Sequence, residues 1–126
     1  FSHSNERTWL PIPTDHAAMA VDIQEKDEHS VLSTYRDFIA WRKQTPALTT
    51  GTFEFIDTPD DVVAFIREMD NQKILCVFNT TENEKTWEYQ DVNGKTLIDN
   101  KNNNLTLDGQ SFHFDAFGYG FVDLSA

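Results

Sequence analysis

Apolar residues between positions 28 and 44 recur with the spacing of an amphipathic helix. The positions that follow the i, i+3, i+4, i+7 pattern are Val31, Leu32, Tyr35, Phe38 and Ile39. Trp41 widens the apolar stripe to about half of the helix circumference, at ~100° per residue. Asp27 is predicted to cap the start of this helix, and Pro46 is predicted to stop it. The pattern therefore predicts one long helix in this part of the chain.

The period changes to two after Gly51, which is typical of β-strands. The segments predicted as strands are 52–56, 62–68, 73–80, 85–90, 96–100, 104–108, 110–114 and 117–124. The second and third are apolar on both faces, as central strands would be. Hairpin turns are expected at residues 69–72, at Asn93-Gly94 and at Asp108-Gly109. About eight short strands predict a mostly β fold, an antiparallel sandwich with Greek-key connections.

Residues 1–29 show no lasting period and are predicted to form an irregular arm. Within it, residues 19–23 are predicted to be a short extended piece. Because the helix stripe is half a circumference wide, it calls for two packing partners, and the sandwich can supply one. We therefore predict that the helix joins this domain to a body outside the 126 residues. The alternative is a self-sufficient domain in which the arm folds over the helix.

Composition narrows the possible partners. The chain carries 10 Lys and Arg against 21 Asp and Glu, a formal net charge of −11. This balance argues against nucleic acid and against anionic membrane surfaces, whereas neutral sugars stay compatible with it. No window approaches a membrane span. The chain starts at Phe1 without a Met or a signal pattern, so we expect it to be excised from something longer.

Candidate catalytic groups are acidic. Carboxylates that lie close in sequence are Asp57, Asp60, Asp61, Glu68, Asp70, Glu82 and Glu84. Glycoside hydrolysis uses carboxylate pairs, but these residues are predicted in turns or on polar strand faces, without an apolar pocket. The four histidines lack zinc-ligand spacing, and Cys76 is expected to be a buried hydrophobe that forms no disulfide within the chain. We predict no catalytic residue, no metal site and no cofactor in this chain.

The aromatic residues near the C-terminus allow two interpretations. Phe117, Tyr119 and Phe121 are predicted on one face of the last strand, and core packing is the favoured interpretation. Gly118 and Gly120 are predicted to let another element approach closely. The alternative is a carbohydrate-binding module with a sugar-stacking platform. That alternative requires four aromatic side chains to be solvent-accessible in a row: Trp87, Tyr89, Tyr119 and Phe121.

The order of these features resembles the C-terminal part of bacterial α-glucosidases of the α-amylase family, glycoside hydrolase family 13, and especially the oligo-1,6-glucosidase branch. The residues that carry the resemblance are Phe1, Ser2, Trp9, Leu10, Pro11, Val21, Gln24, Asp27, Ser30, Val31, Leu32, Tyr35, Arg36, Arg42, Lys43, Pro46, Ala47, Leu48 and Gly51. The strands at 62–68 and 74–81 also fit. The resemblance covers the whole chain and is specific as far as Asn79.

The resemblance implies a (β/α)₈ barrel outside this chain, with residues 1–48 as its end and 49–126 as the C-terminal β-sandwich domain. The helix would be the last barrel helix, and the missing barrel would be its partner. Phe1 and Trp9 would lie near the substrate entrance, because βα connections form the catalytic face of such barrels. The catalytic acids of the family all lie upstream, so the isolated chain is predicted to be inactive.

Three functions stay open at this point. The favoured one is a stabilising C-terminal fragment of an enzyme that hydrolyses α-glucosidic bonds of malto- or isomalto-oligosaccharides. The second is a non-catalytic carbohydrate-binding module for α-glucans. The third is a protein-interaction domain that dimerises through Tyr35, Phe38 and Trp41. The compartment is open, with the cytoplasm favoured over the periplasm.

Overall fold

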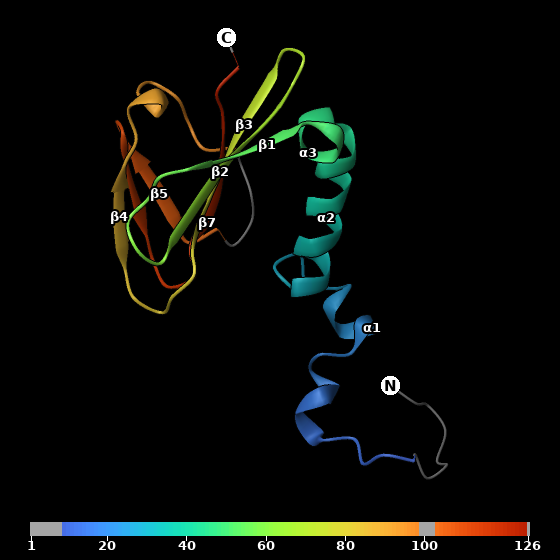
Figure 1. The fold of residues 1–126 in the computed structure, drawn as a ribbon. Coiled ribbons are helices and arrows are strands. Elements are labelled where there is room, and N and C mark those ends of the chain that lie inside the picture. The colour runs from blue at the N-terminus through green and yellow to red at the C-terminus, as the bar shows by residue number, and fades with distance from the viewer. Residues whose placement is uncertain (1–8, 99–102, 126) are drawn as a thin grey trace. The chain divides into compact units, whose positions relative to one another are not determined.

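The alternating segments after Gly51 form two antiparallel sheets (Figure 1). The computed structural model describes residues 9–98 and 103–125. The strands are β1 (Thr52–Ile56), β2 (Val62–Met69), β3 (Gln72–Asn79), β4 (Lys85–Glu88), β5 (Leu105–Asp108), β6 (Ser111–Phe114) and β7 (Tyr119–Asp123). One sheet has the order β1-β2-β3-β7 and the other the order β4-β6-β5. The prediction of a mostly β, antiparallel fold is confirmed.

The strand order also agrees with the predicted connections. β3 lies beside β7, and β4 lies beside β6, so these two pairs join strands that are not consecutive in sequence, as in a Greek-key arrangement. β2 and β3 are central in their sheet, as their apolar sequences predicted. The hairpin at residues 69–72 forms, with Asp70 at a φ of +52°, and so does the hairpin at Asp108-Gly109.

The inner faces of the two sheets pack into one hydrophobic core. The buried members are Val62, Ala64, Ile66, Leu75, Val77, Trp87, Val92, Leu105, Phe112, Phe114 and Val122. All except Val92, which lies in the short 3-10 helix η2 (Gln90–Val92), come from alternate positions of the strands, because successive side chains point to opposite faces of a sheet. Burial of this apolar surface is the main favourable contribution to folding of the sandwich.

Two glycines allow the close approach that the sequence predicted. A Cβ on Gly118 would collide with the backbone oxygen of Asn104, and a Cβ on Gly120 would collide with the side chain of Leu105. The clash at Gly118 is with backbone, so it could not be relieved by a rotamer change. These positions hold β7 against the segment that leads into β5.

Three details of the predicted strands are wrong. The structure has seven strands in its described part, because Leu97 forms only an isolated bridge with Val122; positions 99 and 100 lie outside the described residues. Asn93-Gly94 is not a hairpin turn. It follows the short 3-10 helix η2 (Gln90–Val92), since β4 pairs with β6 rather than with the segment after Gly94. Phe117 lies outside β7, at a φ of +54°.

The predicted long helix is α2 (Val31–Gln44), and it ends before Pro46 as predicted. It starts later than expected, because Ser30 and not Asp27 is its cap. The Ser30 Oγ accepts a hydrogen bond from the Ser33 amide at 3.2 Å, which is the usual geometry at a helix N-terminus. The Asp27 carboxylate instead accepts the His29 amide at 2.9 Å.

The arm contains two short helices that the sequence interpretation missed, η1 (Thr14–Ala17) and α1 (Val21–Gln24). The prediction of an extended piece at residues 19–23 is wrong. Gln24 holds this turn in place: its side-chain amide donates to the Met19 carbonyl at 2.7 Å, and its side-chain oxygen accepts from the Leu32 amide at 3.0 Å. These contacts tie α1 to the start of α2.

A third helix, α3 (Pro46–Thr50), connects α2 to β1 and was also missed. Pro46 stops one helix and starts the next, because proline suits the first helical turn. Ala47 and Leu48 are buried, and Arg67 of β2 binds the end of this helix. Its guanidinium donates to the carbonyls of Leu48, Gly51 and Thr52. The α3–β1 connection is therefore held by the four-stranded sheet.

The chain divides into two compact units, Phe1–Ile39 and Ala40–Ala126. No residue of α2 is buried; Val31 is 81% exposed and Tyr35 is 64% exposed. In the described part of the chain, no helix is long and apolar enough to cross a membrane. The predicted division at residues 48 and 49 stays a prediction.

Candidate functional site

The two residues predicted near a substrate entrance are not brought together by the structure. Phe1 lies outside the described residues, and Trp9 has 94% of its surface exposed. A tryptophan this exposed has no apolar surroundings within the described chain. Its role at a substrate entrance stays a prediction.

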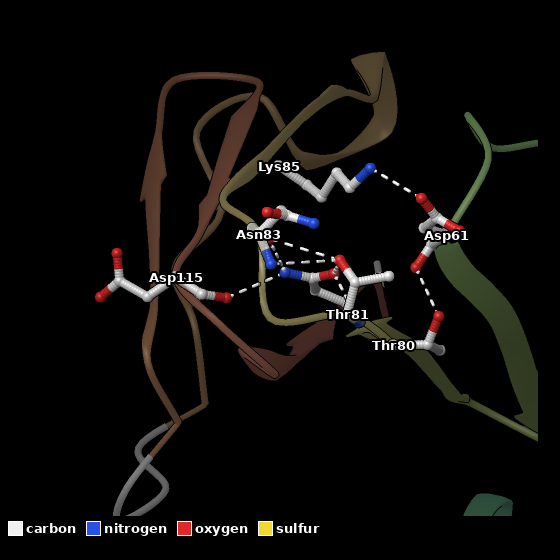
Figure 2. Close-up of polar contacts among 7 residues, drawn as sticks. Asp61, Thr80, Thr81, Asn83, Lys85 and Asp115 are labelled. Atoms are coloured by element: carbon white, nitrogen blue, oxygen red, sulfur yellow. Dashed lines mark hydrogen bonds and ion pairs between the residues drawn. The ribbon is translucent and has the colours of Figure 1, made fainter.

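The acidic candidates do not form an enclosed acid–base pair. All seven carboxylates named from the sequence are exposed to solvent. Asp61 pairs with Lys85 across 2.8 Å, as Figure 2 shows, and this pair is structural. Glu68 and Asp70 line a shallow hollow of about 510 Å³ beside the β2–β3 turn, where Lys73 lies 3.8 Å from Glu68. These groups lack the apolar enclosure in which a catalytic acid of a glycosidase lies.

Metal-ligating residues are scattered. Among the described residues, no group of three or more His, Cys, Asp or Glu side chains could hold a metal ion. His113 points to solvent from β6, as expected.

Cys76 lies in the middle of β3 with 1% of its surface exposed. Burial raises the pKa of its thiol from 9.0 to about 12. Because the thiolate is the reactive form, a thiol with this pKa is inert at neutral pH. The prediction of a buried, structural cysteine is confirmed.

This thiol gives a testable pH dependence. Folding raises the pKa of the Cys76 thiol, because the buried site favours the neutral form. Below pH 9 the thiol is neutral in both the folded and the unfolded state, and the folded state keeps its full stability. As the pH rises from 9 towards 12, only the unfolded state loses the proton, so the free energy of unfolding falls. At pH 8, we expect labelling of native Cys76 by a maleimide to be at least about 100-fold slower than labelling of the unfolded chain. The urea concentration at the midpoint of unfolding should fall more between pH 9 and pH 11 in the wild-type chain than in Cys76→Ala. Equal falls in the two proteins, or rapid maleimide labelling of the folded chain, would contradict a buried thiol at Cys76.

The aromatic residues required for a sugar platform are not exposed in a row. Trp87 and Phe121 are buried at 7% and 2% exposure, and Trp87 stacks on Tyr89 and on Phe112 at centroid distances of 5.2 and 5.5 Å. Burial raises the pKa of the Tyr119 hydroxyl. The favoured interpretation, core packing of Phe117, Tyr119 and Phe121, is wrong for Phe117, which is 62% exposed. Tyr119 and Phe121 lie on the side of the four-stranded sheet opposite the core. The platform alternative has no exposed row to rest on.

Sequence interpretation missed an aromatic surface on the outer side of the four-stranded sheet. We call it the aromatic face, and its members are Phe53, Phe55, Phe65, Phe78, Tyr119 and Phe121. Phe53 and Phe55 are 51% and 71% exposed. The signal was present in the sequence, since β2 and β3 are apolar on both faces. This face is the candidate interaction site of the sandwich.

A second cluster, around Asn79, is a structural corner rather than a binding site. Asn79 is 4% exposed, and its side-chain amide donates to the carbonyls of Asn83 and Asp115 at 2.7 and 3.0 Å. Its side-chain oxygen accepts from the amide and the hydroxyl of Thr81. Figure 2 shows how the residues of this corner converge from separate loops. Among the described side chains, no buried polar atom lacks a partner, so the corner presents no group for a ligand.

Comparison with known proteins places this fold in a defined class. Residues 53–122 match the family described as Maltogenic Amylase, C-terminal domain. This match covers most of the sandwich, so the chain belongs to that family of C-terminal domains. The resemblance to α-glucosidases of the α-amylase family is confirmed.

The relatives are much longer enzymes. The chain is 42% identical over 85 residues to a probable alpha-glucosidase of Rhizobium meliloti (strain 1021), covering 68% of this chain and 15% of that protein. It is 32% identical over 101 residues to a probable oligo-1,6-glucosidase 2 of Bacillus subtilis (strain 168), covering 75% of this chain and 18% of that protein.

Solved structures give the same picture. The alpha-glucosyl transfer enzyme XgtA superposes with a TM-score of 0.81 at 33% identity, over 91% of this chain and 22% of that chain. The chain therefore spans between 15% and 22% of the length of these three proteins.

Proposed function

We propose that this chain is the C-terminal, non-catalytic part of a longer enzyme that hydrolyses α-glucosidic bonds of malto- or isomalto-oligosaccharides. The observation that carries the proposal is the match of residues 53–122 to a C-terminal domain family, in relatives of which the chain covers 15% to 18%. The exposed carboxylates of this chain support it, because catalysis then depends on acids elsewhere in the protein.

In this proposal, residues 1–48 are the end of a catalytic barrel and residues 49–126 are the C-terminal domain. The exposure of Val31 and Tyr35 on α2 supports this division, since apolar side chains on an amphipathic helix call for a packing partner. The domain covers and stabilises the barrel, and oligosaccharides bind to the barrel only. The parent enzyme retains the anomeric configuration through a covalent glucosyl-enzyme intermediate.

The test compares the full-length protein with the isolated chain. We expect the full-length protein to cleave a chromogenic α-glucoside, while residues 1–126 show no turnover. Calorimetry should detect no binding of maltose or maltotriose to residues 1–126. Binding without turnover would favour the carbohydrate-binding module, and turnover by the isolated chain would overturn the proposal.

A further inference from the structure

The outer side of the four-stranded sheet has the character of a covered surface. Register places Phe55, Phe65, Cys76 and Phe121 in one row across β1, β2, β3 and β7, and Val63, Phe78 and Tyr119 in the next. These positions alternate with the core positions, so their side chains lie on the face opposite the core. An antiparallel sheet that faces water on one side normally carries polar residues there.

The aromatic side chains of this face touch one another without a break. The rings of Phe53 and Phe65 stack with their centroids 4.6 Å apart, and those of Phe65 and Phe78 stack with their centroids 5.8 Å apart. Phe78 contacts Phe121 at 5.9 Å, edge to face, and Phe121 contacts Trp41 of α2 at 5.0 Å. The aromatic face thus runs from the edge strand β1 to β7, where Trp41 lies against it.

The solvent exposure of the aromatic face differs between its two ends. At the β7 end, next to Trp41, Phe121 is 2% exposed, whereas Phe55 at the β1 end is 71% exposed. Phe53 and Val63 are exposed as well. A contiguous apolar patch of this kind marks a contact surface in soluble proteins.

We propose that the aromatic face is the surface on which the part of the parent chain outside these 126 residues docks, with its contact centred on Phe53, Phe55 and Val63. This inference rests on the proposed function. Two observations select the occupant. The 85-residue match to a relative at 42% identity covers 15% of that relative, so most of the parent protein is available as a partner. In addition, Trp41, near the end of α2, already packs on Phe121 of the same face.

The chemistry of the exposed end fits a protein partner better than a sugar. Phe53, Phe55 and Val63 offer only carbon atoms, and sugar sites combine ring stacking with placed hydrogen-bond donors and acceptors. Arg67, which lies opposite Phe53 in the register, donates to three backbone carbonyls. Phe53 and Phe55 also meet edge to face at 81°, so they do not form one flat platform. The occupant is therefore an apolar surface of the parent protein.

Hydroxyl-radical footprinting of the full-length protein tests this directly, with mass spectrometry to locate oxidised residues. The rate at each phenylalanine is compared with its own rate in the urea-unfolded protein. We expect Phe53 and Phe55 to be protected at least about tenfold, as Phe112 in the core will be. Oxidation rates at Phe53 and Phe55 within about threefold of their rates in the unfolded protein would overturn the proposal. Such rates would mean that the two side chains are as exposed in the full-length protein as they are in this chain.

Dilution of the protein distinguishes docking within one parent chain from docking of a second copy on the aromatic face. Protection by the same chain is independent of protein concentration, whereas protection that disappears on roughly 100-fold dilution would assign the face to a dimer and overturn the proposal. Footprinting does not use enzyme activity. A full-length protein inactive on α-glucosides would sink the proposed function while the footprint still decides whether the face is covered.

A pair of charge substitutions provides a second measurement. Phe55→Lys in the full-length protein should lower the melting temperature and increase oxidation of Phe53, because docking would bury an unpaired charge. Thr106→Lys, on an exposed position of β5 in the other sheet, is the matched control and should change neither. Equal behaviour of the two variants would also contradict the docking surface.

Discussion

Replacing Phe112 with alanine is expected to lower the free energy of unfolding of this chain by about 3–5 kcal/mol. Phe112 has no exposed surface and lies at the centre of the core, where its ring stacks on Trp87 at 5.5 Å and contacts Phe114 at 5.9 Å. Truncation removes the buried ring and leaves a cavity that rigid neighbouring strands fill only in part. Urea denaturation followed by circular dichroism measures the change.

Phe117→Ala is the matched control for this prediction. Phe117 is 62% exposed and lies outside the strands, so its truncation should change the free energy of unfolding by less than about 0.5 kcal/mol. Similar losses in the two variants would mean that the core assigned to the sandwich is wrong.

The second large effect is expected at Asn79. Asn79→Ala should cost about 3 kcal/mol of unfolding free energy, because it leaves the Thr81 amide and the carbonyls of Asn83 and Asp115 without their buried partner. The loss is larger than that of one hydrogen bond, since each orphaned group keeps its desolvation cost. Denaturation midpoints at a constant m-value would measure it.

Asn83→Ala is the control in the same loop. Asn83 is exposed and takes part in this corner through its backbone carbonyl, which alanine keeps. We expect a change below about 0.5 kcal/mol. A cost at Asn83 equal to that at Asn79 would show that the loop, and not the buried amide, stabilises the corner.

Local signals predicted the elements whose geometry depends on near neighbours in sequence. The i, i+3, i+4 spacing of α2 and its stop before Pro46 are such signals, and so is the Asp108-Gly109 turn between β5 and β6. Gly118 and Gly120 were correctly interpreted as positions of close approach. The resemblance to the C-terminal part of α-glucosidases, based on short motifs, was confirmed by the family match.

The errors arose where distant residues decide the outcome. Asn93-Gly94 has the strongest hairpin signal in the chain, yet β4 pairs with β6 because both contribute to the core through Trp87 and Phe112. Residues 21–24 form a turn of helix, and the side chain of Gln24 bridges Met19 and Leu32, which the pattern of residues 19–23 did not indicate. Neither contact can be deduced from local spacing.

The sequence by itself determined a mostly β domain, one long amphipathic helix and an acidic set of surface carboxylates, because these follow from local period and composition. Only the tertiary structure decided which apolar residues are core and which form the aromatic face. Phe53 and Phe112 both lie between polar neighbours in the sequence, yet one is 51% exposed and the other is fully buried. The difference arises because burial depends on which sheet lies opposite each strand face, and pairing between distant strands sets that arrangement.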